Sequence, residues 1–78
     1  MNATERAELT AELSRVGAEM EALRSEAIRL NAAVLASAEG SIESAVLCAH
    51  AEGVKADHQR AFDMWNSIRN DLRAEQDL

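Results

Sequence analysis

The chain has 78 residues, of which 14 are acidic and 8 are Lys or Arg, and its formal net charge is −6. This length allows one domain at most, the single Cys48 excludes an intramolecular disulfide, and scattered cations disfavour direct binding to a nucleic-acid backbone. Because a core of this size supplies only about 3–5 kcal/mol, we expect the chain to associate with a second copy or another protein.

Nothing in the sequence suggests a membrane protein. The longest strongly apolar run, residues 45–49, is far shorter than the roughly 20 residues that cross a bilayer. The N-terminal stretch is acidic and does not resemble a signal peptide. A lone cysteine suits a reducing compartment. We therefore expect a cytoplasmic protein (in the host cytoplasm if a phage encodes it) with no membrane partner.

The first predicted helix covers residues 4–38. Asn2, with Glu5 three residues later, resembles a capping box at its start. Apolar residues then recur at alternating steps of four and three, which is the helical period. This first ladder consists of Leu9, Leu13, Val16, Met20, Leu23, Ala27, Leu30 and Val34.

A turn is predicted at residues 39–41, because Gly40 can adopt a left-handed conformation and Ser41 can cap a following helix. The second predicted helix covers residues 42–76. Gly53 is a possible break within it, which leaves a three-helix alternative open, although the helical period passes through Gly53 without a slip. The second ladder consists of Leu47, Ala51, Val54, His58, Ala61, Trp65, Ile68 and Leu72.

The two ladders mirror each other about Gly40, so folding the chain there opposes Leu9 with Leu72 and Val34 with Leu47. The predicted fold is all-α. Residues 1–78 form one domain, an antiparallel two-helix hairpin with a coiled-coil-like seam. We also expect Arg6 to face Glu75 at the open end. Two helices enclose a thin core, so the expected assembly is a homodimer that closes a four-helix bundle.

The seam occupies heptad positions a and d, and the positions beside it form two different flanks. The g flank is acidic, with no lysine interleaved, and is a candidate docking surface for a protein with a basic surface. We call its acids the acidic strip: Glu5, Glu12, Glu19, Glu26, Asp57 and Asp71.

The e flank is small, partly apolar and mildly basic, and is the candidate surface for a second hairpin. Other apolar residues lie off the seam near the turn, and contiguous exposed apolar residues usually mark contact sites. The predicted self-association residues are Gly17, Ile28, Leu35, Ile42, Val46 and Phe62.

Potential ligands concentrate only at Cys48, His50 and His58 with nearby acids. No Cys-x-x-Cys or His-x-x-x-His pair occurs, whereas a structural zinc site needs four ligands in a closed tetrahedron. We expect no cofactor, no metal and no catalytic residue. His58 falls within the seam and is interpreted as a packing residue.

The sequence predicts a non-enzymatic protein–protein interaction module, which is a small regulator, inhibitor or assembly factor. The alternative is an acidic phage-type inhibitor that uses the acidic strip to occlude a nucleic-acid-binding host complex, such as a defence or transcription machine. A remote alternative is a metal- or redox-sensing helical protein.

Overall fold

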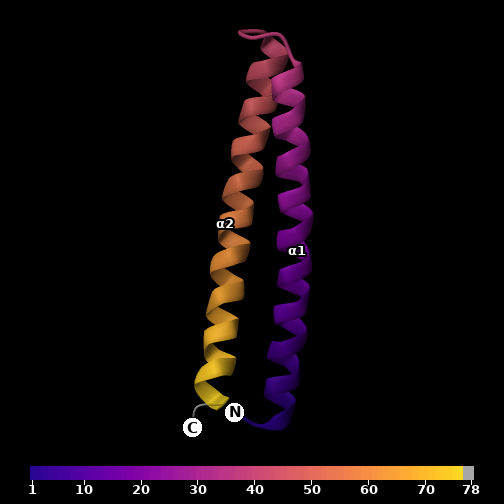
Figure 1. Cartoon of the computed structure of the whole chain (residues 1–78). Helices are drawn as coiled ribbons and strands as arrows, with labels where there is room; N and C mark the ends of the chain where they lie inside the picture. The colour runs from indigo at the N-terminus through magenta and orange to yellow at the C-terminus, as the bar shows by residue number, and fades with distance from the viewer. Residues whose placement is uncertain (77–78) are drawn as a thin grey trace.

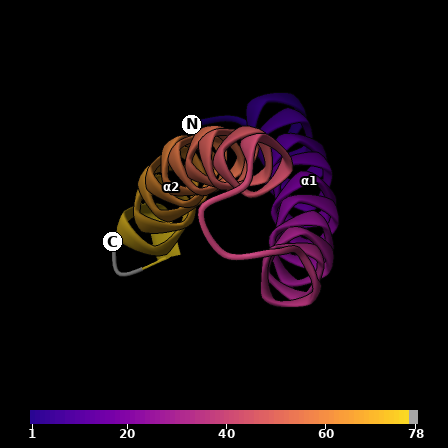
Figure 2. The same cartoon turned by 90° about the horizontal axis from the view of Figure 1, so that it is seen from above.

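The chain folds into a long helical hairpin, seen in a computed structural model that describes residues 1–76 (Figure 1). Helix α1 comprises Ala3–Ala36 and helix α2 comprises Ile42–Gln76. The two helices run antiparallel and pack along their length, with extents of 56 × 14 × 14 Å. The view along the axis shows one helix beside the other, joined by the turn (Figure 2). The predicted all-helical hairpin is confirmed.

The ends of α1 are set by side-chain hydrogen bonds. The Asn2 Oδ1 accepts from the Glu5 backbone N–H at 2.8 Å, and the Asn2 Nδ2 donates to the Glu5 carboxylate. At the other end Ser37 takes an extended conformation, and its Oγ donates to the Val34 carbonyl at 2.7 Å. The helix therefore ends at Ala36, two residues before the expected boundary, because serine competes for the last carbonyls.

The connection to α2 depends on one glycine and one serine. Gly40 has φ = +76°, a conformation that costs an L-residue with a side chain roughly 1–2 kcal/mol. The Ser41 Oγ accepts from the Ser44 N–H at 3.0 Å, which satisfies one of the free donors at the start of α2. Because Gly40 reverses the chain near its midpoint, the two helices have almost equal lengths of 34 and 35 residues.

Helix α2 continues through Gly53 without interruption, so the three-helix alternative is not found. A Cβ built on Gly53 has no neighbour within 4 Å. We expect Gly53→Ala to stabilise the hairpin by about 1 kcal/mol through helix propensity, a rise in Tm of several degrees by circular dichroism. Gly40→Ala is the matched control and should lower Tm, because its φ is positive. Equal shifts of the same sign would contradict this assignment.

The core is the seam that the two ladders predict. All sixteen ladder residues are buried or half-buried. One cluster centres on Val16, Ala61 and Ile68, and the other on Leu30, Ala51 and Val54. Leu23 packs against both clusters, so the core is continuous along the hairpin.

The open end differs from the expected pairing of Arg6 with Glu75. The Glu75 carboxylate instead lies 3.6 Å from the α-amino group of Met1. The start of the chain crosses toward the end of α2 there (Figure 1).

Candidate interaction surfaces

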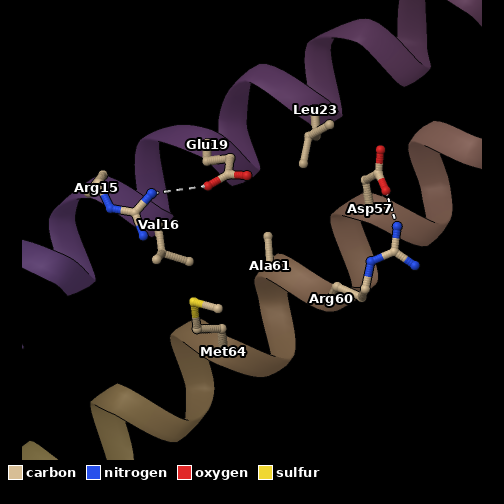
Figure 3. Close-up of a pocket in the computed structure, with 8 residues that line it drawn as sticks. All are labelled: Arg15, Val16, Glu19, Leu23, Asp57, Arg60, Ala61 and Met64. Carbon is tan, nitrogen blue, oxygen red and sulfur yellow. Dashed lines mark hydrogen bonds and ion pairs between the residues drawn. The ribbon is translucent and has the colours of Figure 1, made fainter.

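A shallow groove of about 430 Å³ lies on the g flank, halfway along the hairpin. Glu19 from α1 and Asp57 from α2 stand on its rim (Figure 3). Val16 and Ala61 are buried between the helices and form its apolar floor, and the half-exposed Met64 also lines it. Glu19 and Asp57 therefore line one groove. This agrees with an antiparallel pair of helices, in which the g positions of the two helices lie side by side.

Arginines neutralise much of the acidic strip. Arg15 bonds to Glu12 and also lies 3.6 Å from Glu19. Arg29 pairs with Glu26, and Arg60 pairs with Asp57. Four of the six strip acids thus carry an arginine partner, so the strip is a mixed surface of acids and arginines.

The predicted acidic strip did not include these arginines, because only the absence of lysines between the acids entered the prediction. The signal was present as the spacing Glu-x-x-Arg at Glu12 and Glu26, and Asp-x-x-Arg at Asp57. Residues three apart on a helix are surface neighbours. The arginines occupy c positions, one helical turn beyond each acid.

The pairs also shift the ionisation of the strip. The hydrogen bond from Arg15 holds the pKa of Glu12 below its ordinary value, and the bond from Arg29 does the same to the pKa of Glu26. His50, across the flank on α2, adds a smaller effect that lowers the pKa of Glu26. Both acids are therefore firmly ionised near neutral pH. These pairs are exposed to solvent, which screens them, so they add little to the stability of the hairpin.

The e flank carries a second groove, of about 280 Å³. Its lining joins both helices and presents mostly apolar surface, although four of its six residues are polar: Arg24, Ala27, Ile28, Asn31, Lys55 and His58. His58 is half-buried there, as expected of a residue within the seam.

Trp65 packs against Gly17 on the same side of the molecule. A Cβ built on Gly17 would lie 3.5 Å from the Trp65 Nε1, which is ordinary van der Waals contact. The Arg69 guanidinium carbon lies 4.9 Å from the centre of the Trp65 ring, close enough for a cation–π interaction. The Arg69 Nε is buried and has no hydrogen-bond partner among residues 1–76.

Large apolar side chains are exposed toward the turn. Leu35 is 87% exposed and Ile42 is 85% exposed, while Val46 and Ile28 are about three-fifths exposed. Phe62, farther along the e flank, is 37% exposed. Their heptad positions differ: Ile28 and Leu35 adjoin the e flank, whereas Ile42 and Val46 lie on the outer side of α2. By register, Ile42 and Val46 therefore lie on a different side of the hairpin from Ile28 and Leu35, and the predicted self-association residues remain a prediction.

The residues with ligand chemistry do not converge. Within residues 1–76, no group of three His, Cys, Asp or Glu side chains is placed to hold a metal ion. Cys48 is exposed, as is His50. Neither helix, over the part of the chain that the structure describes, combines the length and apolar character needed to cross a membrane.

Comparison with known proteins adds no family to this description. No protein-family model, no curated protein and no solved structure matches the chain.

Proposed function

We propose that the chain is a non-enzymatic protein–protein interaction module, which dimerises into a four-helix bundle and acts by binding another protein. The observation that carries this proposal is the exposure of Leu35 and Ile42, at 87% and 85%. Side chains of this size gain about 1.5–3 kcal/mol each when they are fully buried. A second protein surface is the natural source of that burial.

The thin core supports the same proposal. The buried hydrophobic residues in the described part of the chain are Val16, Leu30, Ala51, Val54, Ala61 and Ile68, and two of them are alanines that bury little surface. Two stacked hairpins would bury a second face of each helix and add to this core. Association would thus add stability to a hairpin whose own core is thin.

A dimer is preferred over the acidic inhibitor because of the arginine pairs. A strip that imitates nucleic acid needs an unbroken negative field, whereas Arg15, Arg29 and Arg60 each occupy a carboxylate of the acidic strip. The remaining acids still give the molecule its net charge of −6. This charge favours a partner with a basic surface through long-range attraction.

The test measures molar mass by light scattering over a range of concentrations. We expect the natural chain to be dimeric at micromolar concentration. Changing Leu35 and Phe62 together to serine should shift it to monomer, because an apolar contact is lost on both copies. The helical circular dichroism signal should remain, since neither residue is buried in the hairpin.

Glu12, Glu19 and Glu26 provide the matched control on the opposite flank. Reversing all three to lysine should leave the dimer intact under the proposed function. A natural chain that stays monomeric and fully folded up to millimolar concentration would contradict the dimer.

A further inference from the structure

Basic side chains from both helices meet at the groove on the e flank. Arg24 comes from α1, and Lys55 and His58 come from α2. Within the part of the chain that the structure describes, none of the six lining residues is acidic. Acids outnumber Lys and Arg by 14 to 8 in the whole chain. The groove is therefore a locally basic site on an acidic molecule.

The cations of this groove are less fully paired than those of the groove on the g flank. Arg24 makes no ion pair with an acid among residues 1–76. Lys55 has only a loose pair with Glu52, whose carboxylate lies 3.7 Å from the Lys55 Nζ. In the g-flank groove, both lining arginines are paired with acids of their own helix (Figure 3). The e-flank groove thus leaves positive charge available to a ligand.

Arg24 and Lys55 face each other across the e flank. Both occupy e positions, and an antiparallel pair of helices places e positions side by side. Two like charges held side by side repel each other. A carboxylate seated between them would replace this repulsion with two attractive contacts. The half-buried His58 ring offers a further N–H donor within the same groove.

The rest of the lining suits an apolar side chain on a peptide backbone. Ile28 is 59% exposed and Ala27 is half-buried, and most of the surface that the groove presents is apolar. The Asn31 amide adds a donor and an acceptor, which match the two polar atoms of a peptide group. The ligand that fits is a carboxylate next to an apolar side chain.

The size of the groove favours a protein segment over a free small molecule or a nucleic acid. Clefts that enclose small ligands measure roughly 300–1,000 Å³, whereas this groove measures about 280 Å³ and is open to solvent. Binding to a phosphate backbone depends on many Lys and Arg contacts. This groove supplies only two such side chains, on a molecule of net charge −6.

We infer that the e-flank groove binds an acidic segment of another protein, with a carboxylate between Arg24 and Lys55 and a neighbouring apolar side chain against Ile28. This inference rests on the proposed function, in that the chain binds another protein, and it specifies the chemistry of one contact. A partner with a basic surface would be oriented by this contact, because complementary charges fix how two surfaces align. Leu35 and Phe62 lie on the same flank, so the acidic segment and a second copy would compete there.

An NMR titration of the isotope-labelled chain tests the site. The probe is the capped peptide Ser-Glu-Leu-Ser-Glu-Leu-Ser, and the shifted backbone amides should concentrate at residues 24–31 and 55–58. Replacing both glutamates of the peptide by glutamine should weaken binding about tenfold, because the charged contacts are lost. Hexanoate, a free apolar carboxylate, should bind more weakly than the peptide. Equally tight binding of hexanoate would overturn the assignment to a protein segment.

Two double variants with the same change in net charge show which flank binds the peptide. Arg24→Gln with Lys55→Gln should weaken peptide binding about tenfold. Arg29→Gln with Arg60→Gln is the matched control, because it removes two cations outside this groove, and it should change binding by less than about twofold. All four side chains are exposed, so both variants should keep the helical circular dichroism signal.

The outcomes separate this inference from the proposed function. Repeating the titration on the variant with Leu35→Ser and Phe62→Ser removes competition from a second copy. Equal weakening by the two double variants would reveal unspecific charge attraction and overturn the inference, while the dimer would stand. A dimer weakened by Arg24→Gln with Lys55→Gln, without any effect on the peptide, would assign the groove to a second copy and also overturn it. A natural chain that stays monomeric but binds the peptide at this groove would contradict the dimer and support the inference.

Discussion

Leu30→Ala is expected to leave the isolated hairpin largely unfolded at room temperature. Leu30 is only 1% exposed and joins Ala51 and Val54 in the cluster nearer the turn. Truncating a buried leucine to alanine costs about 2–5 kcal/mol. The free energy of unfolding of the whole domain is only about 3–5 kcal/mol. The loss should appear as a sharply reduced helical signal at 222 nm in dilute solution.

Leu35→Ala is the matched control, because it makes the same change on the same helix. Leu35 is 87% exposed, so its truncation should change the stability of the dilute hairpin by less than about 0.5 kcal/mol. At high protein concentration Leu35→Ala should also weaken the proposed dimer, since Leu35 would then lie in the contact between the two copies. Equal destabilisation by the two variants in dilute solution would contradict the assigned helix faces.

The fold could be predicted from the sequence because its main signals are local and periodic. The spacing of apolar residues identifies the buried face of each helix, and Gly40 identifies the turn. The end of α1 was harder to place, because Ala38 is as good a helix former as Ala36. The Ser37 side chain decides it by bonding to Val34, and that choice depends on the geometry of the turn.

The candidate surfaces could be predicted only in part. The two flanks follow from the register, as the two grooves show. The ion pairs of Arg15 and Arg29 are equally local, since each joins residues three apart in the sequence, but they were not part of the prediction. Ile28 and Val46 lie on different sides of the hairpin, which becomes evident only when the heptad positions of both helices are considered together. The buried Nε of Arg69 could not be predicted, because it results from the way one guanidinium lies on the Trp65 ring.

Trp65→Ala is expected to destabilise the hairpin by less than the roughly 3–5 kcal/mol that removal of a fully buried large aromatic side chain costs, because Trp65 is only half-buried. Trp65 packs against the cluster of Val16, Ala61 and Ile68, and its indole covers Gly17. It also supports the Arg69 guanidinium. Phe62→Ala is the matched control, because Phe62 is exposed and takes no part in either core cluster. Urea unfolding followed by circular dichroism would measure both.

A second substitution can refill the space that Trp65→Ala vacates. The Cβ position of Gly17 faces the indole at 3.5 Å, so a leucine at residue 17 would extend into the volume that the ring leaves. Gly17→Leu also removes a helical glycine, which adds about 1 kcal/mol of helix propensity. In the natural background the same leucine should clash with the indole and destabilise the hairpin. The expected signature is a sign reversal, since Gly17→Leu raises the urea midpoint only when Trp65 is alanine.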